Sequence, residues 1–177
     1  RDIPNYWTYA HDFVLQDHMF ESTDSWSLPS HLYLVSGWSA RCSSPTDAMT
    51  CSTNLDQPDQ ESSSRRNGDY AWTDLTYLLH RYGVSWRYYL VPGAQPDCDD
   101  GAITCAPKEQ KVGTPEIWNP LPDFTTVHQD HQLGNIQVET HFLRDARAGT
   151  LPQVSWVVPD RIHSEPPPAK VSDGQAY

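Results

Sequence analysis

Positive charge is scarce in this sequence, and so are long apolar runs. The 177 residues include 12 Lys and Arg against 23 Asp and Glu, which gives a formal net charge of −11. An acidic surface repels phosphate backbones, so nucleic acid is excluded as a partner. No apolar run approaches the roughly 18 residues that a membrane span needs, so we expect no transmembrane segment. A signal peptide is also missing, because the chain opens on charged residues 1–2, and we expect an internal or processed start.

Cysteine is limited to four residues, which fall into two local pairs. Cys42 and Cys51 bracket one short polar segment, and Cys98 and Cys105 bracket another. Neither pair has the C-x-x-C spacing of a zinc knuckle. Short loops closed in this way are typical of disulfides formed in an oxidising compartment, although four reduced loop cysteines would fit the same spacing. We expect the disulfides Cys42–Cys51 and Cys98–Cys105, and with them a secreted protein, periplasmic or extracellular.

Apolar residues recur at helical spacing in several segments of the chain. The expected helices lie at 3–14, 27–35, 75–82 and 135–149. Pro29 near the start and Gly37 just past the end delimit the second helix, and Thr73 is the expected N-cap of the third.

Two segments rich in β-branched and aromatic residues, 84–91 and 153–159, are predicted strands. Polar segments 41–68 and 94–114 are expected to be surface loops held by the cysteine pairs, and the Pro-rich tail from Asp160 is expected to be extended. Helices that alternate with buried strands predict a single α/β domain of three layers, in which helices cover a mostly parallel sheet.

Several weak constellations compete as catalytic or metal sites. Ser39 lies in a stretch that resembles a nucleophile elbow, but Arg41 stands where the second small residue is needed, which argues against a Ser39 hydrolase. Two clusters contain metal-capable side chains: His11, Asp12, Asp17 and His18, and further along His128, Asp130 and His131. Eight histidines among 23 acidic residues produce such clusters by chance, so solvated loop residues are the simpler interpretation.

Ser27 stands out on physical grounds. A serine at a helix N-terminus lies beside unpaired backbone N–H groups and the positive end of the helix dipole. A phosphoryl group could bind there while the hydroxyl attacks it. From spacing alone, the simpler interpretation is that Ser27 caps the helix.

The aromatic content raises a different class, a secreted glycan-binding module. The chain has seven Trp and nine Tyr, whose faces could stack on sugar rings. Trp7, Trp72, Trp86 and Trp156 lie in periodic segments, however, which favours core packing. A glycosidase would need two facing carboxylates, and the spacing selects no such pair.

Five stretches, in order along the chain, carry a resemblance to a known family. They are DIPNYWTYAHDFVLQDHMFES, SWSLPSHLYLVSGWSA, YAWTDLTYLLHRYGVSWRYY, GTPEIWNPLPDFTTVHQDHQLGNIQ and AGTLPQVSWVVPDRIHSEPPPAKVSDGQAY. They resemble the bacterial phosphoesterase family of phospholipases C and acid phosphatases, which shares its fold with the alkaline phosphatase superfamily. The resemblance implies an alkaline-phosphatase-like fold, incomplete in this chain, with residues 1–177 as the central part of one catalytic domain truncated at both ends.

The resemblance also singles out a nucleophile. In that family it is a Ser or Thr followed by a Pro-Asn-His-like segment at the start of a helix, and the matching stretch here is SLPSH, with Ser30 in place of the usual Asn. Ser27 is thereby identified as the nucleophile, which reverses the preference for a capping role. His31, one helical turn later, is expected to support substrate binding, and His128 is a weaker candidate.

A divalent metal ion next to Ser27 is a further implication of the resemblance. The family's acidic ligands lie in a Glu-Asn motif and an Asp-rich motif that this chain does not contain, so we expect an incomplete metal site. The family's Ser-Glu-His-Pro-Pro reads SEPPP here, so Pro166 replaces a substrate-binding histidine, and His163 is the candidate to take over its role.

The expected activity is hydrolysis of phosphoric mono- or diesters, with phospholipids among the candidate substrates. The mechanism implied is metal-assisted attack by Ser27 through a phosphoseryl intermediate. The segment alone is expected to be inactive. The alternatives are a glycan-binding module and a catalytically degenerate family member, for which Pro166 argues. Nothing in the sequence predicts the oligomeric state.

Overall fold

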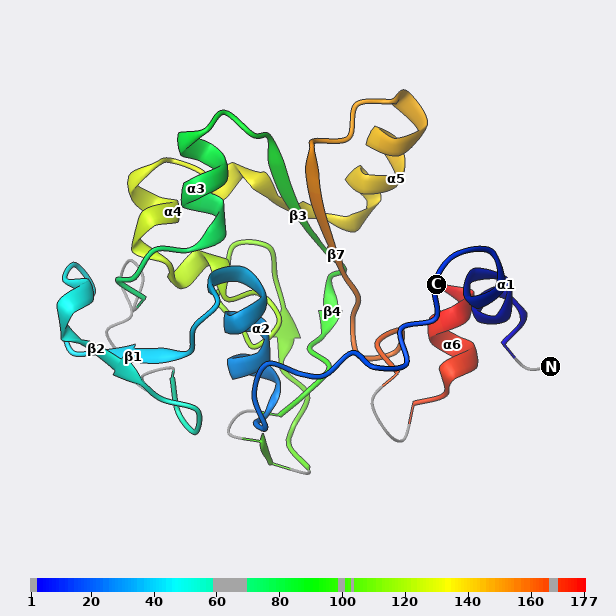
Figure 1. Ribbon diagram of the computed structural model, residues 1–177, viewed down its shortest axis with the longest axis horizontal. Coiled ribbons are helices and arrows are strands. Elements are labelled where there is room, and N and C mark those ends of the chain that lie inside the picture. The colour runs from blue at the N-terminus through cyan, green and yellow to red at the C-terminus, as the bar shows by residue number, and fades with distance from the viewer. Residues whose placement is uncertain (1–2, 59–69, 99–100, 103, 166–168) are drawn as a thin grey trace.

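The computed structural model describes residues 3–58, 70–98, 101–102, 104–165 and 169–177. Its helices are α1 (Pro4–Asp12), α2 (Ser27–Ser36), α3 (Leu75–Arg81), α4 (Thr125–Gln129), α5 (Glu139–Ala148) and α6 (Val171–Ala176). Strands β6 (Ile136–Val138), β3 (Trp86–Leu90) and β7 (Val154–Val158) form a three-stranded parallel sheet in that order (Figure 1). Two small antiparallel pairs lie outside it, β1 (Ala40–Cys42) with β2 (Cys51–Thr53), and β4 (Gly93–Ala94) with β5 (Glu109–Gln110). The predicted α/β class, a parallel sheet flanked by helices, is confirmed, and it is consistent with an alkaline-phosphatase-like fold.

Strand β3 is the centre of the sheet because it pairs with a neighbour on each edge. Its residues alternate between the two faces, as the period of a strand requires. Trp86, Tyr88 and Leu90 belong to the main hydrophobic core, whereas Arg87 and Tyr89 make their contacts with α5. Apolar or aromatic side chains on both faces explain why this segment could be recognised as a buried strand.

Helix α5 covers one face of the sheet. The ring of Tyr89 meets that of Phe142 with centroids 5.4 Å apart, and its hydroxyl donates to Asp145 Oδ2 at 3.0 Å. Asp145 also accepts hydrogen bonds from Arg87 and, at 2.9 Å, from Arg144 Nε. Burial acts to raise the pKa of Asp145, but the hydrogen bonds from Arg144 and Tyr89 outweigh it and hold the pKa below its ordinary value. A single buried carboxylate thus fastens α5 to β3.

Helices α2 and α3 lie on the other side, over the main core. Leu28, Leu32 and Val35 of α2 are buried there together with Tyr88 and Leu90 of β3. Full burial of one such aliphatic side chain contributes about 1.5–3 kcal/mol, so this contact fixes α2 against the sheet. An aromatic group of Tyr70, Trp72 and Phe124 continues the core toward α4.

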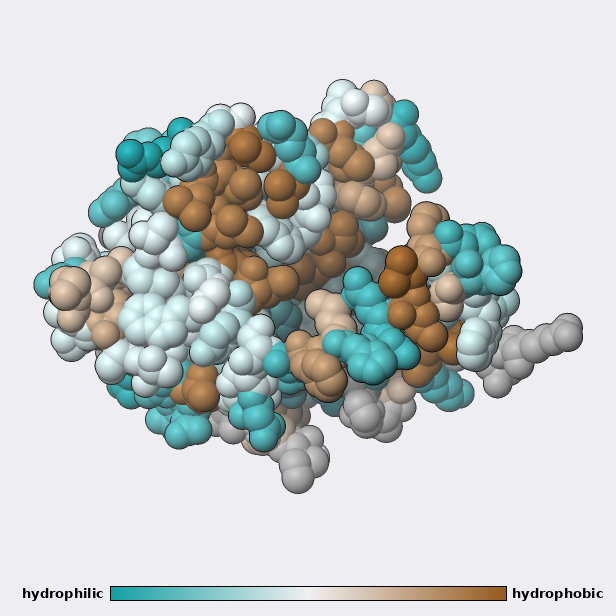
Figure 2. Space-filling model, viewed as in Figure 1, coloured by the Kyte–Doolittle hydropathy of each residue, from teal (hydrophilic) through white to brown (hydrophobic). Residues whose placement is uncertain are grey.

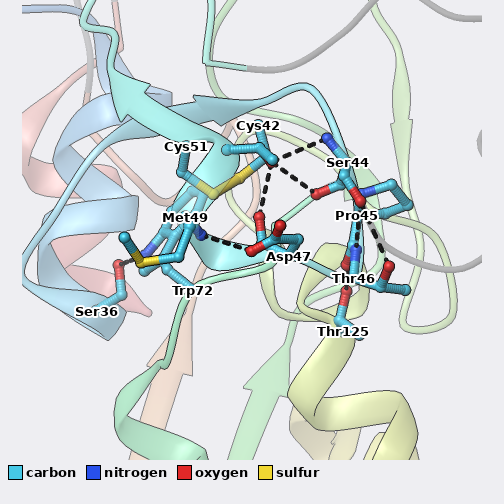
Figure 3. Close-up of a disulfide and its surroundings, with 11 residues drawn as sticks. Ser36, Cys42, Ser44, Pro45, Thr46, Asp47, Met49, Cys51, Trp72 and Thr125 are labelled. Atoms are coloured by element: carbon cyan, nitrogen blue, oxygen red, sulfur yellow. Dashed lines mark hydrogen bonds between the residues drawn. A yellow bond between two sulfur atoms is a disulfide. The ribbon is translucent and has the colours of Figure 1, made fainter.

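Both predicted disulfides are present. Cys42–Cys51 joins paired residues of the β1–β2 hairpin with Cα atoms 3.9 Å apart, and Cys98–Cys105 closes a loop with Cα atoms 5.7 Å apart. Figure 3 shows the first disulfide and its surroundings, where Asp47 accepts a hydrogen bond from the Met49 amide at 2.9 Å. The segment expected as a loop at 41–68 therefore begins as a disulfide-linked hairpin, while its residues 59–68 lie outside the described part of the chain.

Two predicted helix starts are wrong, and so is the prediction of a wholly extended tail. The helix expected at 135–149 begins only at Glu139, because residues Ile136–Val138 form β6 and pair with β3. The N-cap of α3 is Asp74, whose carboxylate accepts from the Thr76 amide at 2.8 Å, and not Thr73. The tail is not wholly extended, since α6 forms near its end; α6 meets α1, where the Asn5 amide donates to Gln175 Oε1 at 3.0 Å (Figure 1).

The expectation that four tryptophans pack in the core is right for Trp72 and Trp86, which are buried. Trp156 is partly buried and packs against the same core. It is wrong for Trp7, which is 64% exposed. The reason is that α1 has no buried residue at all.

Apolar side chains also gather on the surface between α2 and α3 (Figure 2). Leu34 is 55% exposed and Leu78 is 43% exposed, and both line a shallow hollow together with Leu75. None of the helices in the described ranges has the length and apolar character that crossing a bilayer requires.

The role of Asp145 leads to a stability prediction. Asp145→Ala leaves the Arg87 guanidinium and the Tyr89 hydroxyl without their carboxylate, so we expect the free energy of unfolding to fall by about 2–3 kcal/mol. Chemical denaturation measures it. The matched control is Arg147→Ala, an exposed position on the same helix, which should change stability by at most about 0.5 kcal/mol. Equal stability of the two variants would contradict the role given to Asp145.

Candidate functional site

Ser27 is the first residue of α2, and the two residues before it are held in place by side-chain hydrogen bonds. The Ser25 hydroxyl donates to the Leu55 carbonyl at 2.6 Å, and Trp26 Nε1 donates to the Asp56 carbonyl at 2.8 Å. Both bonds fasten the residues before the helix to the segment that leaves the β1–β2 hairpin. The buried residues of α2 hold the helix itself against the core, so Ser27 is fixed from both directions.

The Ser27 hydroxyl does not cap its helix. Trp26 is the N-cap residue, and no side chain caps the helix end. Instead, Ser27 Oγ donates a hydrogen bond to Asp97 Oδ2, a residue 70 positions further along the chain. The other carboxylate oxygen, Oδ1, accepts from the Cys98 amide at 2.8 Å. The capping interpretation of Ser27 is therefore wrong, and the residue that its hydroxyl does meet was not among the predicted ones.

Asp97 is held where the second disulfide loop meets α2. Gly101, inside that loop, has a positive φ of 67°, and a Cβ at this position would come within 3.2 Å of the Trp26 Cβ. Glycine therefore permits a close approach between the loop and the residue before Ser27. The only sequence signal for Asp97 was its position next to Cys98, and no periodicity relates a loop residue to a helix start 70 residues earlier.

His31 lies one turn after Ser27 and contacts it through the backbone. His31 Nδ1 lies 2.7 Å from the Ser27 carbonyl oxygen, so this nitrogen carries the proton and donates. The imidazole also lies against Trp118, with ring centroids 4.7 Å apart. Burial lowers the pKa of His31 from its ordinary 6.5 to about 4, although the Ser27 carbonyl and the charge of Asp97 act in the opposite direction. The ring is thus neutral at neutral pH, with Nε2 unprotonated.

Strand β3 supports this arrangement through Trp118. The Tyr88 hydroxyl donates to the Trp118 carbonyl at 2.6 Å, and burial raises the pKa of Tyr88, so the hydroxyl keeps its proton. Contacts therefore run from Tyr88 at the centre of the sheet, through Trp118 and His31, to the backbone of Ser27. Asp97 follows the carboxyl end of β3 in the chain, and ligands of open parallel α/β sheets bind outside that end of the strands.

The other predicted residues lie apart from this group. His128 is on α4, where Nε2 hydrogen-bonds to the Pro122 carbonyl at 2.7 Å. His163 Nδ1 lies 2.6 Å from Asp160 Oδ1, and its ring lies against that of Tyr177. Pro166 falls outside the described residues. No described contact joins either histidine to Ser27, and their proposed substrate contacts stay predictions.

The remaining candidates have local partners. Ser39 is fully buried and donates to the Asn54 carbonyl at 2.7 Å, which is a structural role. His11 with Asp12 and His18 with Asp17 form exposed neighbouring pairs 2.7 and 2.8 Å apart. A cavity of about 410 Å³ lies at the amino ends of β3 and β7, beside Trp86 and Pro152. No predicted site residue lines it.

The donors around Ser27 fit the expected divalent metal only in part. Oxygen ligands suit hard divalent ions, and Ser27 and Asp97 both offer oxygens. Among the described residues, however, no three His, Cys, Asp or Glu side chains converge as a metal site would require. These two residues are too few to hold an ion by themselves.

Comparison with known proteins agrees with the resemblance. The model of the Phosphoesterase family matches residues 1–177, and the chain belongs to the phosphoesterase family. Two similar proteins, each named Phospholipase C B and from Mycobacterium tuberculosis strains CDC 1551 / Oshkosh and ATCC 25618 / H37Rv, are 26% identical over 176 residues, 98% of this chain. The chain spans 30% of the length of these relatives. No solved structure matches it.

The buried, neutral His31 predicts a pH dependence of stability. Because its pKa falls on folding from 6.5 to about 4, the unfolded state binds more protons in this window, and stability is lost as pH falls from 6.5 toward 4. Thermal melting across that range should show a smaller loss for His31→Gln, which cannot titrate, than for the wild type. His80→Gln, at an exposed histidine of α3, is the control and should keep the wild-type loss. Identical losses in His31→Gln and wild type would contradict the burial of a neutral imidazole.

Proposed function

We propose that the whole protein hydrolyses phosphoric mono- or diesters, phospholipids among them, with Ser27 as the nucleophile. The observation that carries the proposal is the family match over residues 1–177 combined with the position of Ser27 at the first turn of α2. The printed name of the relatives, Phospholipase C B, supports a phosphoester substrate. The amino end of a helix favours an anionic group, which agrees with a phosphoryl group placed there.

The proposed reaction is a double displacement. Ser27 Oγ forms a bond to phosphorus while the bond between phosphorus and the alcohol oxygen breaks; the serine proton is lost to solvent and the leaving alkoxide gains one. Water then attacks the phosphoserine, which restores the serine hydroxyl and releases the phosphate product. Pro29 contributes no N–H, so the amides of Ser27 and Leu28 are the backbone donors of the first turn that can face a phosphoryl oxygen.

His31 is proposed to assist binding in a specific protonation state. In the free site its Nδ1 proton is directed at the Ser27 carbonyl, so Nε2 can only accept a hydrogen bond. Donation from Nε2 to a phosphate oxygen requires a second proton on the ring, and a bound phosphate dianion favours that protonation. His128 is proposed as a lesser contact.

A divalent metal ion is also part of the proposal, and when bound it would neutralise charge on the transferring phosphoryl group. Ser27 is the oxygen donor that residues 1–177 would bring near it. We propose that the remaining ligands belong to other parts of the whole protein and that residues 1–177 are the central portion of its catalytic domain, inactive alone. The two disulfides support a secreted, periplasmic or extracellular location.

The test is hydrolysis of an aryl phosphate monoester and an aryl phosphate diester by the whole protein, with and without a chelator. We expect Ser27→Ala to lower kcat by at least about 10³-fold, since removal of a nucleophile eliminates the covalent route. Chelation should abolish turnover, and the preferred ester identifies the substrate class.

The control is Ser22→Ala, at an exposed serine five residues before Ser27, which should keep the wild-type activity. Full turnover by Ser27→Ala would rule out the assigned nucleophile. Absence of turnover in a folded, metal-loaded wild type would favour a degenerate family member, and Pro166→His is then the first variant to make.

A further inference from the structure

We propose that Asp97, held in place by the Cys98–Cys105 disulfide loop, is a positioning residue that orients the Ser27 hydroxyl for attack. The inference rests on the proposed function, because it gives Asp97 a role only if Ser27 is the nucleophile. Its structural basis is the hydrogen bond from Ser27 Oγ to Asp97 Oδ2, which links two segments 70 residues apart.

The direction of this bond determines which part of the serine oxygen can react. With its proton directed at Asp97, Ser27 Oγ turns its lone pairs away from the carboxylate. An electrophilic phosphorus atom can therefore approach from the side opposite Asp97, where the two negative groups are furthest apart. A serine with a freely rotating hydroxyl would lose this preference, and misplacement of a reacting group by about 1 Å can cost roughly 10²-fold in rate.

Asp97 is itself oriented by its second oxygen. Asp97 Oδ1 accepts from the Cys98 amide at 2.8 Å, so both carboxylate oxygens are used and the side chain has one preferred rotation. Cys98 is buried and bonded to Cys105, and Gly101 in the same loop approaches Trp26, the residue before Ser27. The start of α2 is thus contacted at two points, by Gly101 inside the disulfide loop and by Asp97 immediately before it.

The Cys98–Cys105 disulfide joins residues that are seven positions apart in the sequence. A bridge over so short a loop removes little conformational entropy from the unfolded chain compared with a long one, so its main effect is local. In the folded protein it limits the positions that Asp97 can take. Reduction of the bridge should loosen Asp97 and with it the Ser27 hydroxyl.

The experiment measures kcat and KM of the whole protein on the ester that it prefers. Asp97→Ala should lower kcat by about 10- to 100-fold with KM changed by less than about 2-fold, because the acceptor of the nucleophile is lost and the substrate contacts are not. Asp97→Asn, which keeps one carbonyl oxygen, should retain more activity than Asp97→Ala. Asp24→Ala removes an exposed carboxylate three residues before Ser27 and is the matched control, with no expected change in kcat.

The role of the disulfide is tested by a double-mutant cycle. In a Cys98→Ser/Cys105→Ser background, Asp97→Ala should cost much less than in the wild type, because the loop no longer holds the carboxylate on Ser27. Cys42→Ser/Cys51→Ser removes the other disulfide and is the matched background, in which Asp97→Ala should keep its full effect. Thermal melting of each variant separates loss of folding from loss of positioning.

The outcomes distinguish this inference from the proposed function. Wild-type kcat in Asp97→Ala, beside an inactive Ser27→Ala, overturns the positioning role and leaves the nucleophile in place. An equal effect of Asp97→Ala in both disulfide backgrounds overturns the role of the Cys98–Cys105 loop. A rise in KM without a fall in kcat assigns Asp97 to substrate binding and overturns positioning. Full turnover by Ser27→Ala contradicts the proposed function itself.

Discussion

The pairing of β3 with a neighbour on each edge is the constraint from which the rest of the structure follows. Because β3 is buried on both faces, every residue of the strand has a defined partner above or below the sheet. Arg87 and Tyr89 hold α5 through Asp145, and Tyr88 and Leu90 receive the apolar side of α2. The helix that carries Ser27 is thereby placed by the sheet and not by a side-chain N-cap, which it lacks.

The site at the start of α2 joins segments that are distant in sequence. Two contacts at Ser25 and Trp26 come from the segment after the first disulfide hairpin, and two more come from the second disulfide loop through Asp97 and Gly101. Each of these polar segments contains a disulfide, which restricts its conformation where there is little apolar surface to bury. Of the two disulfides, Cys98–Cys105 is the one next to Asp97, the residue that accepts the hydrogen bond from the Ser27 hydroxyl.

Electrostatics makes local positioning important in this protein. Residues 1–177 carry a formal net charge of −11, so under the proposed function this part of the protein would offer a phosphoester no long-range attraction. Under the proposed function, binding would come from short-range groups: the amides of the first turn of α2, the proposed metal ion, and His31 once a bound phosphate favours its protonation. Asp97 places a carboxylate next to the Ser27 hydroxyl, where we propose that it orients the nucleophile.

Much of the fold could be predicted, since it depends on local signals. Strands β3 and β7 were recognisable by their apolar and aromatic runs, and α2 by Pro29 and Gly37 at its ends. Strand β6 was missed because its three residues are too few to show a period of two, and their state is decided by pairing with β3. For the site, a family motif could identify Ser27, while Asp97 was unpredictable because its proximity to Ser27 arises only from the folded loop.

The measurement that tests the central claim most directly is capture of the covalent intermediate. The whole protein is mixed with its preferred phosphoester, quenched in acid during turnover, digested and analysed by mass spectrometry. The account predicts a phosphate group on Ser27 that disappears when the substrate is exhausted. A phosphate group on a different residue, or steady turnover with no phosphorylated peptide at any quench time, would contradict it.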